Sequence, residues 1–382
     1  MSWRITGRGL RMLLIGFLFF WCAVSMKIKL LLLAPVCIAL AFLYAAISSL
    51  WTGLTLRVES EAQPAHILRG ENSTVTVTLS HRSLLPAGRA LLQSREETKE
   101  LVFKCFSPVA YETEFLGRHV GKYEMGPDEI EVRDLFYLCR FRVKCAGTAQ
   151  LMVLPRAFPI DKPEVNAGED GLKSLPRSQE DFNAPDDTRA YREGDTLKRV
   201  HWKLSARRME LVVRKYETPA PPDTLILLDT GVPDERAEAP AVAADLRDAL
   251  CETAVAVAKM QMEDESPVRL PLHGAQAVEF AADHARSLES LQEMLACQNF
   301  DRAEPFEEVL HAEMRRMQRT GAVVVLSSRL NAAIAEAICD IRRMGPGVRL
   351  YLVTGNTEDP EYKTHILLLQ RHFVEVCFVT PA

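Results

Sequence analysis

The stretch Thr224–Pro233 reads TLILLDTGVP and decides the fold of the C-terminal part of the chain. Its first five residues carry no charge and form a short apolar run, which is typical of a strand buried on both faces of a parallel sheet. Further strand-like runs then alternate with segments of helical periodicity. The predicted strands cover residues 268–272, 277–280, 322–327, 348–353 and 373–379, and the predicted helices cover residues 241–262, 283–297, 305–319, 331–344 and 360–370. This alternation predicts a doubly wound, mainly parallel α/β sheet over residues 223–382.

The end of the first strand is where a ligand site is expected, because open α/β sheets bind ligands at the carboxyl ends of their strands. Asp229 and Thr230 follow this strand, and Ser327 ends a later one. A metal-ion-dependent adhesion site would require the pattern D-x-S-x-S here, since Mg²⁺ prefers hard oxygen ligands. Gly231 and Pro233 replace both serines. We therefore expect a degenerate adhesion site without a tight divalent metal, in which Asp229 serves as an N-cap or turn residue.

A basic and aromatic segment precedes this strand and reads RAYREGDTLKRVHWKLSARRMELVVRKYE from Arg189 to Glu217. As far as Lys215 it holds nine Lys or Arg, one His and only three acids, although the whole chain has a net charge of −5. One interpretation is that these cations pair with acids of the preceding linker, since ion-paired surface helices are common. The other is an anion site or a docking surface for an acidic partner, because planar Arg side chains supply both charge and geometry. No nucleophile or second base stands at a telling spacing, which disfavours a catalytic role for His201.

The periodicity of this segment predicts a helix over residues 196–207 with Asp195 as its N-cap, followed by a strand over residues 211–216. On this helix one face is aliphatic, and an adjoining stripe is basic. The stripe consists of Arg199, Lys203 and Arg207, while Trp202 lies with Lys198 and Ala206 away from the aliphatic face. The aliphatic face of the helix and its basic and aromatic side are thus both expected to contact other groups.

The N-terminus contains two apolar runs, residues 12–26 and 30–50, separated by Lys27 and Lys29. The second run has the length that crosses a bilayer, about 20 residues. The first is short for a crossing and follows three arginines, as the core of a signal peptide does. No small-x-small cleavage pattern follows it, so we predict a transmembrane helical hairpin over residues 1–51. The positive-inside rule favours the arginines on the cytoplasmic side, and two crossings return the chain there, whereas a single crossing would place it outside.

Residues 52–155 are predicted to form a β-rich, sandwich-like module, because short alternating segments are punctuated by Gly and Pro. The predicted strands cover residues 73–80, 100–106, 109–116, 129–133, 141–144 and 149–154. We find no catalytic constellation in this module. Residues 155–185 are rich in Pro and polar residues, which predicts a surface crossing without regular structure. Residues 156–222 are therefore interpreted as a linker plus the basic-aromatic segment.

Composition excludes several classes of protein. The chain has 382 residues, 48 % of them hydrophobic and 25 % charged, which is typical of a folded protein with two or three domains. The mild acidity argues against general nucleic-acid binding. Nine cysteines without a C-x-x-C pair fit a reducing compartment, and a pairing of Cys139 with Cys145 is disfavoured against packing in a core. The chain has no G-x-x-x-x-G-K-[ST] motif, so it is not itself a P-loop ATPase.

The basic-aromatic segment carries a resemblance to a known family. Its pattern R-x-Y-R-x-G-D-x-x-K-R-V-H-W-K-x-S-A-R resembles the signature of the domain of unknown function 58 family. The matching positions are Arg189, Tyr191, Arg192, Gly194, Asp195, Arg199, His201, Trp202, Lys203, Ala206 and Arg207. Residues 121–155 resemble the family's upstream β region, with Leu135 where the family more often has Pro. The resemblance implies a membrane-anchored protein with a von Willebrand factor A-like domain, typically encoded beside a MoxR-type AAA+ ATPase. No enzymatic activity is established for the family.

These observations favour a non-enzymatic, membrane-anchored adaptor or assembly factor. It is expected to work with a MoxR-type AAA+ ATPase in the maturation of a protein complex, so its partners are the lipid bilayer, the ATPase and a client protein. We expect no cofactor, no nucleic-acid ligand and no catalytic residues. The expected location is the inner or plasma membrane, with the soluble domains in the cytoplasm. The alternatives are a hydrolase or a metal-dependent adhesion module that uses the strand-end cleft near Asp229 and Ser327.

Overall fold

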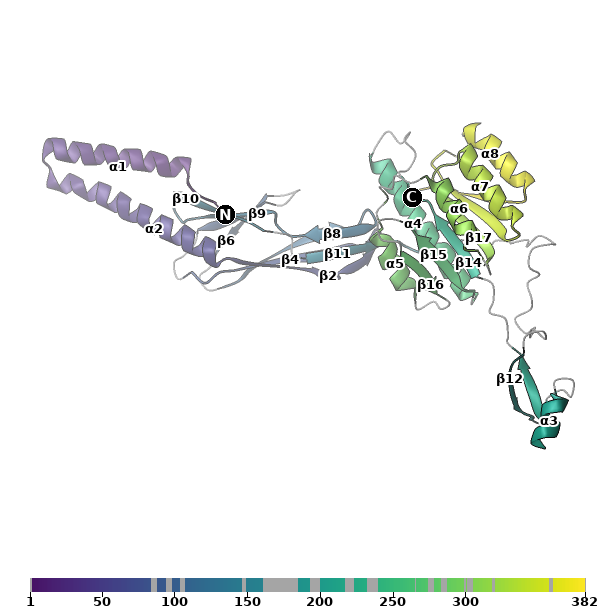
Figure 1. Ribbon diagram of the computed structural model, residues 1–382. Helices are drawn as coiled ribbons and strands as arrows, with labels where there is room; N and C mark the ends of the chain where they lie inside the picture. The colour runs from purple at the N-terminus through teal and green to yellow at the C-terminus, as the bar shows by residue number, and fades with distance from the viewer. Residues whose placement is uncertain are drawn as a thin grey trace. The chain divides into compact units, whose positions relative to one another are not determined.

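The structure of the chain is a computed structural model, shown in Figure 1. It describes residues 2–83, 88–93, 98–103, 107–145, 149–160, 185–192, 200–216, 223–231, 240–264, 266–273, 278–282, 287–298, 300, 305–317, 320–356 and 360–381. The chain divides into two compact units, Met1–Leu154 and Pro155–Ala382. Each unit contains its own apolar core.

Two apolar helices form a hairpin at the start of the first unit (Figure 1). Helix α1 spans Gly7–Met26 and α2 spans Leu33–Thr55, and the short 3₁₀ helix η1 at Lys29–Leu32 joins them. Both are long and apolar enough to cross a membrane, as the sequence predicts. Helix α1 starts before the predicted apolar run because Thr6 caps it, with Thr6 Oγ1 accepting a hydrogen bond from Gly9 N at 3.1 Å. At 1.5 Å per residue, its 20 residues reach about 30 Å.

Close contacts fix the base of this hairpin to the neighbouring strands. A Cβ on Gly9 of α1 would lie 2.4 Å from the carbonyl oxygen of Leu138. A Cβ on Gly53 of α2 would lie 2.1 Å from the ring of Phe141. Because any side chain at these positions would collide, glycine is required where the helices approach the strands. The hairpin and the adjacent sheet are therefore packed together within the first unit.

Three sheets form the rest of the first unit. Their strand orders are β1-β10-β9-β5-β6, β2-β4-β7 and β3-β11-β8. The strands span Ser2–Ile5 (β1), Arg57–Gln63 (β2), His66–Leu68 (β3), Asn72–Ser80 (β4), Arg89–Gln93 (β5), Thr98–Val102 (β6), Val109–Leu116 (β7), Gly121–Met125 (β8), Glu129–Arg133 (β9), Cys139–Lys144 (β10) and Ala149–Leu154 (β11). Buried residues from all three sheets, such as Val77, Ile130 and Leu151, share one core. Cys139 and Cys145 are both free thiols.

The sequence located the alternating strands of this unit and missed the others. Strands β7, β9 and β11 have the predicted bounds. The predicted strand over residues 100–106 is displaced, because β6 ends at Val102, and residues 104–106 lie outside the described residues. Strand β2 reads RVESEAQ and buries only Ala62, so its apolar alternation is weak. Strands β1, β3, β5 and β8 have only three to five residues each and were also missed.

The second unit begins with a small antiparallel hairpin that contains the basic-aromatic segment. Its elements are β12 (Pro185–Ala190), α3 (Trp202–Arg208) and β13 (Val212–Tyr216). Strands β12 and β13 pair antiparallel, and α3 lies between them in the sequence.

The predicted start of the helix in this segment is wrong. Val200 forms a bridge with Val213, and His201, with non-helical backbone angles, takes the capping position before Trp202. Val200 is buried by this pairing, so its apolar character reflects a strand contact instead of a helical face. Asp195, the predicted N-cap, lies outside the described residues. The helix is shorter than predicted because a tertiary contact competes for its first turn.

A six-stranded sheet with helices on both faces forms the rest of the second unit (Figure 1). Its order is β16-β15-β14-β17-β18-β19, and it is mixed because β16 alone runs antiparallel to its neighbour. The strands span Asp223–Leu228 (β14), Val268–Leu272 (β15), Val278–Ala282 (β16), Thr320–Ser327 (β17), Gly347–Val353 (β18) and Glu375–Val379 (β19). The helices span Pro240–Glu263 (α4), Leu288–Ala296 (α5), Phe306–Met314 (α6), Ala332–Arg343 (α7) and Pro360–Arg371 (α8). The predicted alternation of strands and helices is present, with ends that differ by a few residues.

Strand β14 lies at the centre of this sheet and is buried on both faces. Ile226 and Leu228 join a core with residues of α4 and α5. Leu225 and Leu227 join a second core with residues of α6, α7 and α8. This two-sided burial confirms the interpretation of the apolar run TLILL as a central strand. It also fixes where the chain leaves the sheet, at Asp229.

Candidate functional site

Polar residues collect at the carboxyl ends of the two central strands, β14 and β17. Counted in chain order, the strands of this sheet lie in the order 3-2-1-4-5-6, so the order reverses between these two. Open α/β sheets place their ligand sites at such a reversal. Asp229 directly follows β14, and Ser327 is the last residue of β17. Both are buried, and the pairing of Leu228 with Leu326 brings the two strand ends together.

The carboxylate of Asp229 is saturated by hydrogen bonds from this chain. Arg329 donates from Nε to Oδ2 at 2.9 Å and from Nη2 to Oδ1 at 3.0 Å. Ser327 donates from Oγ to Oδ2 at 2.8 Å, and the backbone of Gly231 donates to Oδ1 at 3.0 Å. The last bond, from residue i+2 to an Asp side chain, defines an Asx turn. Asp229 is therefore a turn residue that is also clamped by a two-point arginine pair.

Gly231 leaves the space that the arginine occupies. A Cβ on Gly231 would lie 2.1 Å from Nη2 of Arg329 and 3.0 Å from Oδ1 of Asp229. In a D-x-S-x-S adhesion site this position would carry a serine with a side-chain oxygen for the metal. The same glycine that removes this ligand admits the guanidinium beside Asp229.

The charge of this cluster opposes cation binding. The hydrogen bond to Asp229 raises the pKa of Arg329 above its ordinary value, although burial of the guanidinium acts the other way. The arginine therefore stays protonated and neutralises the carboxylate. A divalent metal would have to displace this bidentate partner and would still find few oxygen ligands. The site is an internal ion pair that holds the ends of β14 and β17.

The remaining residues predicted at this edge are also enclosed. Thr230 is buried, and Ser327 is fully buried with its Oγ accepting a hydrogen bond from the backbone N of Arg329 at 3.1 Å. Ser327 and Asp229 do converge, but both oxygens of the carboxylate already accept hydrogen bonds from Arg329. A buried hydroxyl held in this way does not have the access that a nucleophile needs. Arg329 was missed from sequence because it becomes Asp229's partner only through the pairing of β14 with β17.

The signature residues around α3 hold the small hairpin together. His201 Nδ1 accepts a hydrogen bond from Leu204 N at 3.2 Å and so caps α3. Ser205 is buried, and its Oγ accepts a hydrogen bond from Val212 N at 2.9 Å, which attaches α3 to β13. Tyr191 N donates to the carbonyl of Leu211 at 2.8 Å. His201 thus has a structural role at the start of a helix, and Ser205, the serine of the signature pattern, holds that helix to β13.

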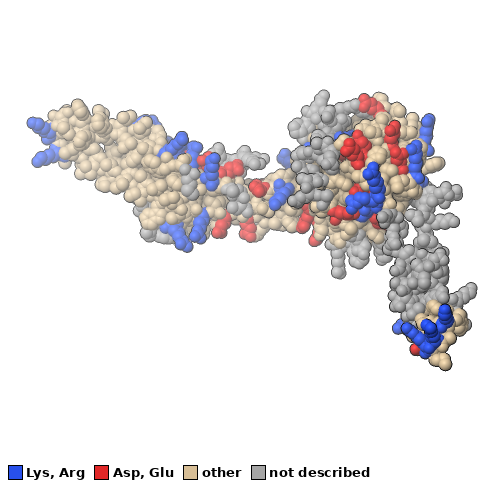
Figure 2. Space-filling view, viewed as in Figure 1, with Lys and Arg blue, Asp and Glu red and all other residues tan. Residues whose placement is uncertain are grey.

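Other signature residues of α3 form an exposed basic and aromatic surface. Lys203, Ala206 and Arg207 are exposed, and Trp202 is 63 % exposed. Met209, which follows the helix, is 93 % exposed. Figure 2 shows Lys and Arg side chains gathered over this part of the chain. We name Trp202, Lys203, Arg207 and Met209 the α3 surface, since it combines two exposed apolar side chains with two exposed cations.

The remaining predicted signature residues are placed only in part. Arg192 is exposed, and the backbone of Arg189 lies in β12. Gly194, Asp195 and Arg199 lie outside the described residues. The predicted basic stripe is therefore described only at Lys203 and Arg207, which lie one turn apart on α3.

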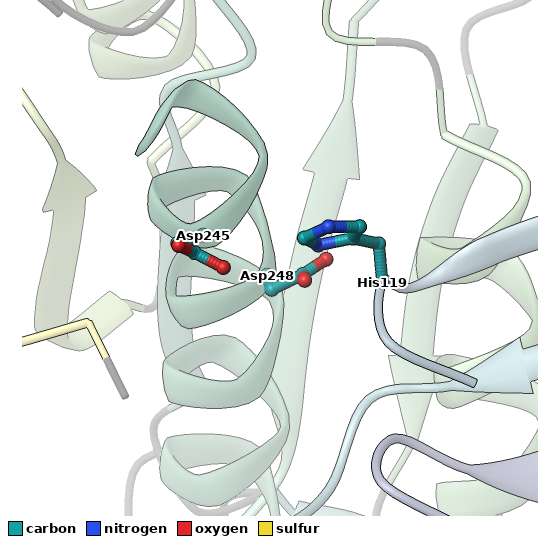
Figure 3. Close-up of side chains that lie close together, drawn as sticks. All are labelled: His119, Asp245 and Asp248. Carbon is teal, nitrogen blue, oxygen red and sulfur yellow. The ribbon is translucent and has the colours of Figure 1, made fainter. Parts of the chain in front are cut away.

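Two further acids lie on α4, the helix that follows the Asp229 strand. Figure 3 shows Asp245 and Asp248 one turn apart on this helix. Asp248 is buried and Asp245 is half-buried. His119, also drawn there, belongs to the loop between β7 and β8 in the first unit. Among the described residues of the second unit, these two carboxylates form no close group with a third His, Cys or acidic side chain.

A protein-family model matches part of the chain. Residues 187–345 match the family model described as "Protein of unknown function DUF58". This DUF58 segment runs from β12 through α7 and includes both the α3 surface and the Asp229–Arg329 pair. It also contains the signature positions from Arg189 to Arg207, whereas residues 121–155 lie outside it. No curated protein matches the chain.

Two solved structures show weak likeness. One is the Pseudomonas fluorescens alkylpurine DNA glycosylase AlkC bound to DNA with an abasic site analog, with 13 % identity, a TM-score of 0.15 and coverage of 35 % of this chain and 42 % of that one. The other is Cwp6 from Clostridium difficile, with 10 % identity, a TM-score of 0.14 and coverage of 84 % and 45 %. The chain thus spans less than half the length of either structure, and neither likeness carries an argument.

Proposed function

We propose that the chain is a membrane-anchored, non-enzymatic adaptor or assembly factor that works with a MoxR-type AAA+ ATPase in the maturation of a protein complex. The observation that carries this proposal is the occupation of the strand-edge site by the chain's own Arg329. A site filled by an internal ion pair favours a scaffold over a catalyst or a metal-dependent receptor. The α3 surface then remains as the surface for a partner.

We further propose that the six-stranded sheet is a von Willebrand factor A-like domain. The support is the strand order around β14, the antiparallel edge strand β16, and an aspartate at the end of the first strand. In this proposal the Asp229 position descends from a metal-site position in which the cation has been replaced by a guanidinium. The folded parts lie in the cytoplasm, and the apolar hairpin of α1 and α2 anchors them to the inner or plasma membrane.

The partner role is assigned to the α3 surface because of its chemistry. Trp202 and Met209 offer apolar contact area, and Lys203 and Arg207 offer positive charge. Aromatic and arginine side chains dominate the binding energy of many protein interfaces. An acidic patch with an apolar centre on the ATPase or on a client is the complementary surface.

The test is a pull-down of the ATPase by the full-length chain in detergent micelles. The double variant Lys203→Glu with Arg207→Glu is expected to weaken binding by at least tenfold, since like-charge contacts replace opposite ones. The matched control reverses two exposed cations of α8, Lys363→Glu with Arg371→Glu, and is expected to bind as the wild type does. Equal binding by the α3 variant and the wild type would remove the role proposed for this surface.

A metal-dependent adhesion module and a hydrolase remain alternatives because Ser327 and Asp229 converge within 2.8 Å. Calorimetry with Mg²⁺ and Mn²⁺ separates the adhesion module from the adaptor. We expect no heat of binding below millimolar concentrations, because the arginine clamp must break before a cation can enter. Tight binding of either ion would favour the adhesion module instead.

A further inference from the structure

The five-stranded sheet of the first unit presents a row of four arginines on one face. In the pairing of β1, β10, β9 and β5, Arg4 lies opposite Arg140, Arg140 opposite Arg133, and Arg133 opposite Arg89. Directly paired residues of neighbouring strands point to the same face, about 5 Å apart. Like charges in this arrangement destabilise a sheet. The row is therefore unfavourable for folding unless its charge is compensated.

Acids on the same face compensate only part of this charge. Glu131 accepts hydrogen bonds from Arg133 Nε at 2.7 Å and from Arg142 Nε at 2.8 Å, and Arg140 Nη1 lies 3.6 Å away. Burial acts to raise the pKa of Glu131, but the two arginine hydrogen bonds outweigh it and leave this pKa below its ordinary value. Glu100 pairs with Arg89 at 3.1 Å. Five arginines therefore face two carboxylates among these residues.

This face adjoins the point where the apolar hairpin leaves the sheet. Only Thr6 separates β1 from α1. The ring of Tyr137, in the connection between β9 and β10, has the guanidinium of Arg8 from α1 at 5.5 Å. Leu135 and Phe136, in the same connection, are 52 % and 50 % exposed, and Phe136 packs edge-on against Tyr44 of α2. Exposed apolar residues beside arginines, at the base of a membrane hairpin, are typical of a membrane interface.

The length of the hairpin brings this face close to the lipid headgroups. Between the last N-terminal arginine, Arg11, and the end of α1 at Met26 there are fifteen residues, or about 22 Å of helix. A bilayer core is about 30 Å thick. A short apolar span is accommodated by thinning of the bilayer and by flanking arginines that reach into the headgroup layer. Figure 2 shows Lys and Arg side chains where the hairpin meets the strands of the first unit.

We propose that the arginine row Arg4–Arg140–Arg133–Arg89 binds the phosphate groups of anionic phospholipids in the leaflet from which the hairpin emerges. This proposal rests on the proposed membrane anchoring. A planar guanidinium engages phosphate with paired hydrogen bonds, and four in a row span several neighbouring headgroups. Binding relieves the repulsion along the row and fixes the sheet against the membrane surface. The surface thus selects anionic over zwitterionic lipid.

The test measures lipid retained by the full-length chain after exchange into an equimolar mixture of phosphatidylglycerol and phosphatidylcholine, followed by native mass spectrometry. Wild-type protein is expected to retain phosphatidylglycerol preferentially. The variant Arg4→Gln with Arg140→Gln leaves both short hydrogen bonds of Glu131 in place. Each cation near a lipid surface is worth about 1 kcal/mol, so at low salt the loss of two should lower the preference by roughly thirtyfold. Soluble glycerol phosphate in excess is expected to leave the retained lipid unchanged.

The matched control removes two exposed cations elsewhere in the same unit, Arg118→Gln in the loop before β8 with Lys122→Gln in β8, and is expected to keep the wild-type preference. An equal preference in the Arg4/Arg140 variant and the wild type would overturn the proposal, as would release of the lipid by glycerol phosphate. Flotation with pure phosphatidylcholine vesicles tests the anchor separately. Wild type and variant should both float. A wild-type chain that fails to float would contradict the proposed membrane anchoring. A chain that floats but shows no lipid preference would contradict only the role proposed for the arginine row.

Discussion

The Asp229 strand edge and the α3 surface are both charged regions of the DUF58 segment. The charged groups of the first are paired inside the protein, whereas those of the second are exposed. At the strand edge, Asp229 is buried and receives four hydrogen bonds from its own chain. On α3, Lys203 and Arg207 are exposed beside an exposed Trp202. The first region has satisfied its polar groups internally, and the second presents them to solvent. The difference supports our proposal that the strand edge is structural and that the α3 surface is the one offered to a partner.

The largest expected effect comes from breaking the clamp at the strand edge. Arg329→Ala leaves the buried Asp229 carboxylate without its cation, which costs about 2–3 kcal/mol after allowance for the partial exposure of the arginine. Hydrogen exchange of the β14 and β17 amides in the full-length chain measures this loss. The double variant Arg329→Ala with Asp229→Asn should recover part of it, because no charge is then left unpaired. Unchanged protection in Arg329→Ala would show that the pair is not structural.

A smaller effect is expected from closing the space beside the arginine. Gly231→Ala places a methyl group within 2.1 Å of Arg329 Nη2, so the guanidinium must shift, at a cost of about 1–2 kcal/mol. The matched control is Gly355→Ala, where a Cβ meets no atom within 4 Å. The same exchange experiment should register loss of protection at β14 for the first variant only. Equal behaviour of the two variants would contradict the argument that Gly231 admits the arginine.

Within the α3 region, a buried hydrogen bond should matter more than any exposed residue. Ser205→Ala removes the acceptor of Val212 N and should destabilise the β12–β13 hairpin by about 1 kcal/mol. The neighbouring substitution Ala206→Ser, at an exposed position, is the control and should be close to neutral. Exchange rates of the β13 amides distinguish the two. Faster exchange in the control than in Ser205→Ala would reverse the assignment of structural and exposed sides.

The smallest effect on stability is expected on the α3 surface itself. Trp202→Ala should change the free energy of unfolding by less than about 0.5 kcal/mol, because most of the ring is exposed. Its effect should appear in the pull-down of the partner instead, as weakened binding. A loss of stability comparable to that of Ser205→Ala would mean that Trp202 packs against the protein and is not part of a binding surface.

Local sequence patterns were sufficient to predict helices and strands, but they did not predict which residues contact each other in the folded chain. The run TLILL predicted β14 because burial on both faces removes polar residues from the strand itself. The start of α3 was predicted too early because Val200 looks helical in sequence and is recruited by Val213 across the hairpin. Arg329 could not be assigned to Asp229, since they are a hundred residues apart and meet only through the β14–β17 pairing. Sequence therefore indicated where a site would lie but not what fills it.

The connections of the apolar hairpin have a mechanical consequence. A single residue, Thr6, joins β1 to α1, and a single residue, Leu56, joins α2 to β2. Gly9 and Gly53 bring the same helix ends into direct contact with Leu138 and Phe141. Neither connection is long enough to extend under a pulling force. A force applied to the strands of the first unit is therefore transmitted directly to α1 and α2, so the hairpin is rigidly connected to these strands.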